Sequence, residues 1–236
     1  TRLWIERGDL HMIQVMRKGP GWIGRLVSNK SGAAAIEFGL ILPILTGMGM
    51  MGTEIGYMAM VNLQVSQMAL AVADAGSRLE QTNNSSVAPT VTEVDVDSVM
   101  VGAEKMGEGI DFKTNGRVIL SSLEKDPATG KQFIHWQRCF GNLKVNSDYG
   151  NDSTNNGLNG TALVSMGRGT TKVTAPTGVA VMFVEIFYDY KGVFGTMFVK
   201  KMRFKQEAAY LVRDIRDLRA SNLSGVTGGN GKSVCT

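Results

Sequence analysis

The sequence predicts an α+β protein, in which one long N-terminal helix packs on a C-terminal antiparallel sheet of about four strands. Residues 33–53 form an apolar run, and apolar residues at helical spacing continue after it as far as Leu79. From residue 116 onwards the pattern changes to period two, in segments rich in Val, Ile, Phe and Tyr. A sheet laid on the amphipathic half of the helix is the economical arrangement of these elements.

The apolar run at 33–53 is long enough to cross a membrane. Its 21 residues span ~31 Å as a helix at ~1.5 Å per residue, which matches a hydrocarbon core of ~30 Å. Pro43 lies inside the run and is expected to kink the helix. Glu37 also lies inside it, where a carboxylate without a partner is costly. The run predicts a transmembrane helix segment in which Glu37 needs an explanation.

Residues 54–80 are expected to continue the same helix as an amphipathic half outside the membrane. Apolar residues recur there at spacings of three and four, which favours one buried stripe. The whole helix would then contain about 45 residues, with half of it available to cover a soluble domain. The predicted stripe is Met58, Val61, Val65, Met68, Val72, Ala75 and Leu79, and the residues expected off it are Glu54, Asn62, Gln67, Asp74 and Arg78.

Residues 81–236 are expected to form an α+β domain. A polar linker at 81–90 ends the long helix, and residues 91–107 are consistent with a short helix capped by Thr or Asp. A loop rich in Gly, Asn and Ser at 147–170 is of a kind that is often functional. The Gly/Ser-rich tail after Arg219 is expected to be flexible.

Four strand-like segments supply the predicted sheet, and a turn joins the first two of them. The turn sequence DPATGK, at residues 126–131, is typical of a hairpin. The segments lie at residues 116–126, 131–141, 178–190 and 196–212.

The excess positive charge of the chain lies before the apolar run. Residues 1–32 hold six basic residues against two acidic ones, whereas the rest of the chain holds 19 of each sign. This argues against nucleic-acid binding by the folded part, which would need a basic face there. It fits the positive-inside rule, with a basic cytoplasmic leader at 1–32. Thr1 is not an initiator, and Met12 and Met16 are both plausible starts.

The two cysteines, Cys139 and Cys235, have no motif spacing, and with His11 and His135 they make no recognisable zinc site. If the domain lies outside the cytoplasm, one disulfide between them is the natural expectation, and two free buried thiols are the alternative.

The chain offers no pattern of an enzyme active site. Acidic and amide residues at 148–152 could supply oxygen ligands, but they lack the EF-hand spacing. His135 beside Trp136 on a strand favours packing over catalysis, and one such histidine supports no Ser-His-Asp set. No phosphate-binding loop occurs. We therefore expect no catalytic residue, no metal and no cofactor, and a protein that is not an enzyme.

Three interpretations of the N-terminal part are open. A cleavable secretory signal would use the small residues at 71–74, but that site lies about 18 residues beyond an apolar run already too long for such a signal. A plain single-pass anchor would leave Gly32 and Glu37 unexplained. In the third interpretation the basic leader ends at Gly32, small residues follow from Ala33, and Glu37 is the fifth residue after the glycine.

The third interpretation rests on a resemblance. The arrangement of Gly32, Ala33 and Glu37 resembles the class III signal of type IV pilins, which a membrane-embedded prepilin peptidase cuts on the cytoplasmic face after the glycine. The resemblance implies that Ala33 becomes the new N-terminal amine. Glu37 would then pair with such an amine of a neighbouring subunit, so that two charges that are costly apart become tolerable together.

The segment GAAAIEFGLILPIL at 32–45, with the alanine-rich helix at 52–78, is similar to the TadE-like family of the tight-adherence (Tad, Flp, type IVc) pilus system. Members share a G-AAAxEFAxxLP segment and a second acidic residue near the end of the apolar run, here Glu54. The resemblance implies a pilin-like fold and a minor pilin or pseudopilin that takes part in pilus assembly and surface adherence. The alternative is an unprocessed single-pass inner-membrane protein whose periplasmic domain binds a partner.

The resemblance also implies partners and a location. The expected partners are other pilin subunits and minor pilins, the prepilin peptidase, the Tad inner-membrane assembly platform and membrane lipid. The chain would cross the bacterial inner membrane once, with a cytoplasmic N-terminus and a periplasmic domain, and could enter the extracellular pilus. Gly52 and Gly56 form a GxxxG pattern that favours close helix packing in an assembly, although glycines merely tolerated in an apolar helix are an equal alternative.

Overall fold

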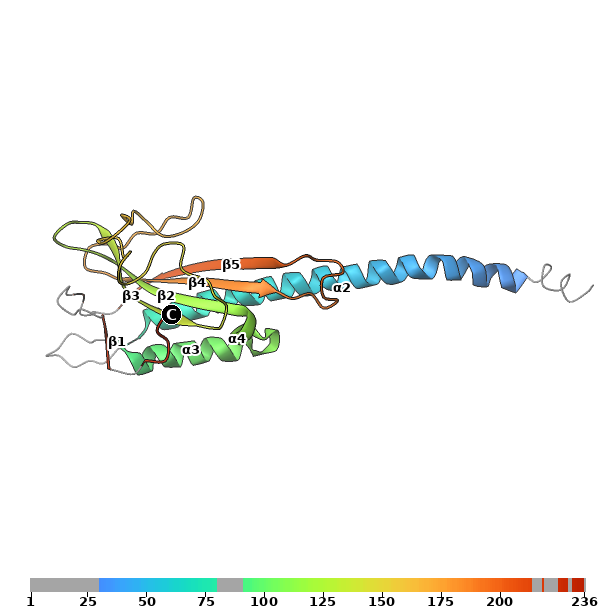
Figure 1. The fold of residues 1–236 in the computed structure, drawn as a ribbon, viewed down its shortest axis with the longest axis horizontal. Coiled ribbons are helices and arrows are strands. Elements are labelled where there is room, and N and C mark those ends of the chain that lie inside the picture. Colours follow the sequence, from blue (N-terminus) through green and yellow to red (C-terminus); the bar gives the residue numbers. More distant parts are fainter. Residues whose placement is uncertain (1–29, 80–90, 214–217, 219–224, 229–230, 236) are drawn as a thin grey trace, which may run out of the picture. The chain divides into compact units, whose positions relative to one another are not determined.

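The computed structural model describes residues 30–79, 91–213, 218, 225–228 and 231–235 (Figure 1). Residues 1–29 of the predicted leader, the linker at 81–90, and residues 220–224, 229–230 and 236 of the tail lie outside these residues. The helices are α2 (Lys30–Ser77), α3 (Glu93–Gly107), the 3-10 helix η1 (Glu108–Ile110) and α4 (Phe112–Asn115). The strands are β1 (Val91–Thr92), β2 (Gly116–Lys125), β3 (Gln132–Phe140), β4 (Val181–Tyr190), β5 (Met202–Leu211) and β6 (Val226–Thr227).

The predicted α+β fold is confirmed. Strands β2 to β5 form one antiparallel sheet in the order β3-β2-β4-β5, and the long helix precedes it in the chain. The predicted hairpin turn joins β2 to β3, where Gly130 adopts a φ of 72° and Asp126 accepts a hydrogen bond from the backbone N–H of Thr129 at 3.0 Å. The fourth strand begins at Met202 rather than at residue 196, because residues 191–201 form the β4–β5 loop.

Helix α2 is a single helix of 48 residues that continues through Pro43. The predicted buried stripe is confirmed, because four of its members, Val61, Val65, Met68 and Val72, are almost fully buried. The prediction for Glu54 was wrong, since its side chain is also fully buried. Glu54 precedes Met58 by four residues and so extends the same stripe by one helical turn.

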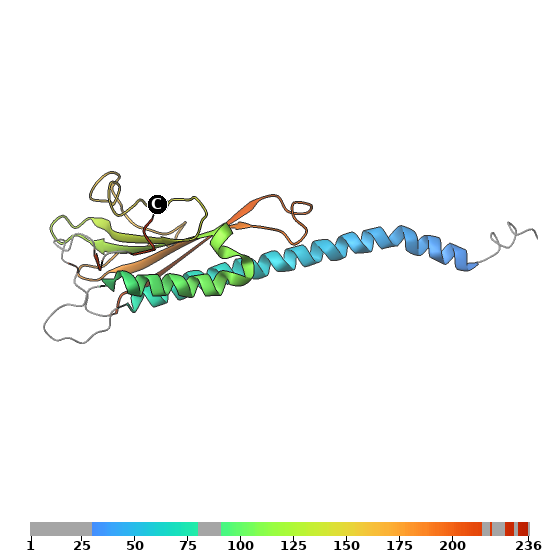
Figure 2. The same cartoon turned by 60° about the horizontal axis from the view of Figure 1, so that its bottom comes forward.

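The chain divides into two compact units, Thr1–Met50 and Met51–Thr236. In the second unit, α2 and α3 cover one face of the sheet, as Figure 2 shows. The packing of α2 on the sheet is close at Gly76, where an added Cβ would lie 3.2 Å from the Leu120 side chain of β2. Alternate residues of β4, from Met182 to Tyr190, point into this core.

Helix α3 is positioned by a capping box at its N-terminus. The Thr92 hydroxyl accepts from the backbone N–H of Asp95 at 3.3 Å, and the Asp95 carboxylate accepts from the backbone N–H of Thr92 at 3.3 Å. A buried ion pair then fixes α3 to the sheet, because the Arg138 guanidinium of β3 contacts both carboxylate oxygens of Glu93. The predicted short helix with a Thr cap is confirmed.

The opposite face of the sheet is covered by residues 142–173, which contain no helix and no strand. Small apolar clusters lie beneath this long loop, around Phe183 and Met166 and around Ile119 and Phe187. The last described residues return to the sheet, where the backbone N–H of Cys139 donates to the Ser233 carbonyl at 2.6 Å. Cys139 and Cys235 form a disulfide there.

Candidate functional site: the N-terminal helix and its junction with the domain

The apolar segment, residues 33–53, is exposed along nearly all of its length. Ile36, Phe38 and Leu40 are 66%, 61% and 70% exposed. Within the described residues, one helix is long and apolar enough to cross a membrane, and it is this one, over Gly32–Ser77. A soluble domain rarely leaves so large an apolar surface uncovered, so the segment fits a helix that crosses a membrane or packs against other apolar helices.

Gly32 and Ala33 lie in the first turns of α2, which begins at Lys30. Both residues are exposed, and a Cβ added to Gly32 would meet no atom within 4 Å. The peptide bond between them is therefore accessible from outside the helix. Glycine also lowers the cost of leaving helical geometry, which a protease requires of the bond that it cuts.

Glu37 is exposed on the apolar segment. No hydrogen bond or ion pair joins its carboxylate to any residue that the structure describes. A carboxylate on a helix that lipid or other helices must cover needs a positive partner or several donors. The described part of the chain supplies neither.

Gly52 and Gly56 lie on one exposed side of α2, with Ala59 one turn further on. A Cβ added to either glycine would meet nothing within 4 Å. The pair therefore leaves the helix backbone open to close approach, which is the property that small residues give to helix interfaces. Within the described residues, no other part of the chain packs against the helix at these two glycines.

Glu54 forms the junction between α2 and the sheet. Its side chain is 0% exposed, and each carboxylate oxygen has one donor. The Tyr190 hydroxyl donates to Oε1 at 2.8 Å, and the backbone N–H of Phe194 donates to Oε2 at 3.1 Å. Gly192 permits this approach, because an added Cβ would lie 2.4 Å from Oε1. Two well-placed donors offset part of the cost of burying the carboxylate.

Tyr190 is itself fixed by aromatic neighbours. Its ring centroid lies 6.1 Å from that of Tyr57 on α2 and 5.5 Å from that of Phe204 on β5. Burial raises the pKa of Tyr190 above its ordinary value, and the hydrogen bond to Glu54 raises it further. The hydroxyl therefore stays protonated and remains a donor across the physiological range of pH.

A second polar cluster fixes the long loop to the outer face of the sheet. Lys205 of β5, whose side chain is 7% exposed, lies 2.6 Å from carboxylate oxygens of Asp148 and Glu207 and 3.0 Å from Glu185. Burial alone would lower the pKa of Lys205, but the hydrogen bonds to Asp148 and Glu207 and the charge of Glu185 raise it above its ordinary value. The Tyr149 hydroxyl completes the cluster by donating to Glu207 at 2.9 Å.

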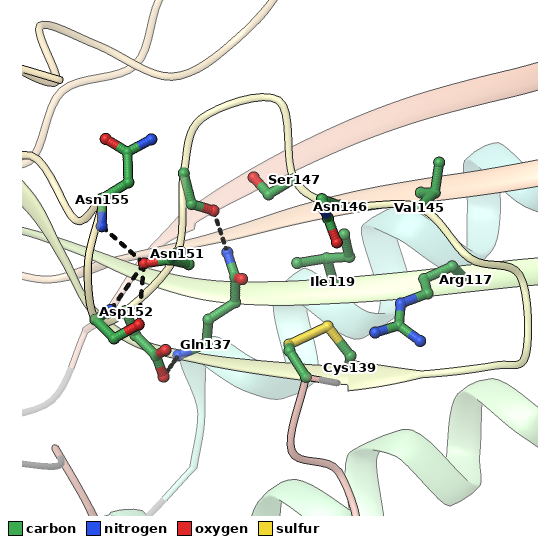
Figure 3. A pocket seen from close by; sticks show the side chains of 13 residues that line it. Arg117, Ile119, Gln137, Cys139, Val145, Asn146, Ser147, Asn151, Asp152 and Asn155 are labelled. Carbon is green, nitrogen blue, oxygen red and sulfur yellow. Dashed lines mark hydrogen bonds between the residues drawn. A yellow bond between two sulfur atoms is a disulfide. The ribbon is translucent and has the colours of Figure 1, made fainter. Parts of the chain in front are cut away.

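A pocket of about 360 Å³ lies where the long loop crosses β2 and β3 (Figure 3). Two hydrogen bonds join its walls: the backbone N–H of Gln137 donates to Asp152 at 3.0 Å, and the Gln137 side chain donates to the Gly150 carbonyl at 3.3 Å. The Cys139–Cys235 disulfide and Arg117 line the same space. These bonds hold the loop in place.

His135 has a carboxylate partner that the sequence did not reveal. Its Nδ1 lies 2.9 Å from the Glu124 carboxylate, whose other oxygen accepts from the Ser122 hydroxyl at 2.8 Å. The carboxylate stands between hydroxyl and imidazole, so the histidine cannot act on the serine as a base. Among the described residues, no group of three or more His, Cys, Asp or Glu side chains is placed to hold a metal ion.

Comparison with known proteins adds one match. Residues 32–74 match the family model described as TadE-like protein. No curated protein and no solved structure matches the chain. The matched range contains the apolar segment, Glu37, both glycines of the GxxxG pattern and Glu54, and it ends inside α2. The similarity to TadE-like proteins therefore covers most of α2 and none of the sheet.

Proposed function

We propose that this protein is a minor pilin or pseudopilin of a Tad (type IVc) pilus, which takes part in pilus assembly and surface adherence. The observation that carries the proposal is a TadE-like helix whose apolar segment is exposed, at the start of a chain whose second unit has its own core. An exposed apolar helix is satisfied by lipid before assembly and by other such helices afterwards. The partners are membrane lipid, other pilin subunits and minor pilins, and the Tad inner-membrane assembly platform.

A prepilin peptidase is proposed to cut the bond between Gly32 and Ala33. The accessible bond and the open space around Gly32 support this step. The cut removes the basic leader and gives Ala33 a free α-amine. This amine can supply the positive partner that Glu37 lacks within the described residues, and a neighbouring subunit in a helix bundle is its natural source.

The domain after the helix is proposed to lie in the periplasm, with the N-terminus in the cytoplasm and one pass through the inner membrane. The excess of basic residues before the apolar segment supports this orientation. The disulfide supports it as well, because disulfides persist in oxidising compartments.

N-terminal sequencing of the protein after co-expression with a prepilin peptidase tests the proposal. The chain should begin at Ala33, and Gly32→Leu should leave the leader attached. Gly39→Leu is the matched control, because Gly39 is exposed on the same helix with equally open space, and this variant should be cut normally. An intact leader in the protein recovered from sheared pili would refute processing and favour the unprocessed single-pass protein.

A further inference from the structure

The β4–β5 loop, residues 191–201, gathers exposed apolar side chains in a short segment. Val193, Met197 and Phe198 are exposed, with Met197 at 71%. Three exposed lysines, Lys191, Lys200 and Lys201, flank them. A cluster of exposed apolar residues with basic residues at its edges is typical of a surface that enters the interfacial region of a membrane.

Hydrogen bonds and ring contacts hold this loop in a defined conformation. The backbone N–H of Gly195 donates to the Gly192 carbonyl at 3.1 Å, and Gly195 adopts a φ of 65° to close this turn. The Phe194 and Phe198 rings pack edge to face at 5.9 Å. The backbone N–H of Phe194 donates to Glu54, which fixes the loop against α2. The side chain of Met197 is exposed to solvent.

The position of the loop is fixed relative to the end of the apolar segment. Glu54, which binds Tyr190 and the Phe194 backbone, directly follows Thr53, the last residue of that segment. Figures 1 and 2 both show the loop beside this part of α2. A bilayer that ends near Thr53 would therefore meet the loop at its headgroup level.

Charge favours lipid over a purely apolar partner. No ion pair joins the three flanking lysines to a carboxylate within the part of the chain that the structure describes. The hydrogen bond from Arg203 and, after it, the charge of Lys201 lower the pKa of Asp189, but lysines without a close carboxylate are still attracted by the anionic phospholipid headgroups of a membrane. Their aliphatic stems can lie along the interface while the ammonium groups reach the phosphates.

We propose that residues 191–201 are a membrane-surface anchor. Val193, Met197 and Phe198 enter the interfacial region of the leaflet through which α2 leaves the bilayer, and the lysines bind the headgroups of anionic phospholipids. The anchor rests on the proposed function in one respect, since it requires the apolar segment to span the membrane. It holds the domain against the bilayer until the subunit leaves for a fibre.

A fluorescence experiment on the full chain tests this anchor. The Met197→Trp protein is reconstituted into phosphatidylcholine vesicles with about three parts in ten of phosphatidylglycerol, with and without brominated acyl chains. Quenching by the brominated lipid should exceed that of the wild type, whose own tryptophans give the background. Val164→Trp is the matched control: Val164 is 79% exposed, and its neighbour Leu163 bridges Gln132 at the opposite end of the sheet. This control should show no added quenching.

A charge reversal tests the lysines separately. Lys200→Glu/Lys201→Glu should reduce the quenching of the Met197→Trp protein several-fold, with the effect growing with the fraction of anionic lipid. Lys125→Glu/Lys131→Glu, at the β2–β3 turn, changes charge equally at the far end of the sheet and should leave the quenching unchanged.

Resistance to alkaline extraction measures insertion of the helix independently. If the Met197→Trp chain resists extraction but its added tryptophan is not quenched, the anchor is refuted while the transmembrane helix stands. If alkaline treatment extracts the wild-type chain from the vesicles, both the transmembrane helix and the anchor are refuted. A blue-shifted emission that brominated lipid does not quench, and that fades as lipid is added, would overturn the anchor in favour of contact with a second copy of the chain.

Discussion

The Tyr190 hydroxyl donates to the Glu54 carboxylate at 2.8 Å, although 136 residues separate the two in the chain. The bond joins the first turn of the buried stripe of α2 to the end of β4, one of the two inner strands of the sheet. A buried carboxylate at this point serves as a fixed acceptor for the β4–β5 loop, and it also sets the distance between the loop and the end of the apolar segment.

Removing either partner should destabilise the domain by different amounts. Glu54→Ala leaves two buried donors unsatisfied and should cost about 2–4 kcal/mol, whereas Tyr190→Phe removes one donor and should cost about 1–2 kcal/mol. Denaturant unfolding of the full chain in detergent micelles, followed by the fluorescence of the buried Trp136, measures both. The double variant should lose less than the sum, and strict additivity would show that the pair does not interact.

Gly192→Ala should destabilise the same junction by steric overlap. The new Cβ would lie 2.4 Å from Glu54 Oε1 and 2.6 Å from the Gly195 carbonyl, so the loop must shift. Gly102→Ala is the control, because Gly102 lies in helix α3 with nothing within 4 Å, and alanine there should stabilise by up to about 1 kcal/mol. Equal stability of the two variants would contradict the geometry of the junction.

Lys205→Met should cause a loss of stability that depends on pH. At pH 7 it leaves the fully buried Glu185 without its cation, at a cost on the order of 3–5 kcal/mol. Burial raises the pKa of Glu185 already in the native protein. The folded state therefore binds a proton before the unfolded chain does, and stability is gained as pH falls through the raised pKa and lost as pH rises through it.

The loss in the Lys205→Met protein should accordingly shrink as pH falls from about 7 towards 4.5. Unfolding curves at several pH values measure it. Lys144→Met, which removes an exposed lysine from the same long loop, should change stability little at any of them. A loss in Lys205→Met that stays constant over this range would show that Glu185 is not the group left unpaired.

The disulfide should contribute strongly to stability, because Cys139 and Cys235 are 96 residues apart. Chain-entropy arguments give up to about 4–5 kcal/mol for a loop of this length, and less in practice. Cys139→Ala/Cys235→Ala should lower the free energy of unfolding accordingly, and the native protein should shift in gel mobility on reduction. Quantitative labelling of free thiols in the native protein would contradict the bond.

Glu37→Gln should separate insertion from assembly. Removal of the charge lowers the cost of insertion, so the monomer should accumulate in the inner membrane at normal or higher levels, and cutting after Gly32 should persist. Incorporation should fail, because the buried amine of a neighbouring subunit loses its counter-charge at a cost on the order of 3–5 kcal/mol. Fractionation of sheared pili measures the incorporation of the variant. Recovery equal to that of the wild type would show that Glu37 does not pair with a neighbouring amine.

The elements of the fold follow from the sequence because their signals are local. The stripe from Val61 to Val72, the Thr92 cap and the period-two strands each express a rule that acts within a few residues. The burial of Glu54 could not be predicted in this way, because a carboxylate is buried only where hydrogen-bond donors are available. Its donors come from Tyr190 and Phe194, far along the chain. The burial of Lys205 could not be predicted for a similar reason, since two of its partners, Asp148 and Glu185, lie on the long loop and on β4.

One helix serves both the apolar segment and the core, and this has a mechanical consequence. A pull on the apolar segment acts along the axis of α2, and Figure 1 shows β4 and β5 running alongside the part of α2 that fills the core. Such a load is applied in shear, so that a row of side-chain contacts must give way together rather than one after another. Under tension, the lifetime of the domain would be set by its rate of forced unfolding. A force that pulls the helix out of a bilayer would then be resisted by the whole length of the contact between α2 and the sheet.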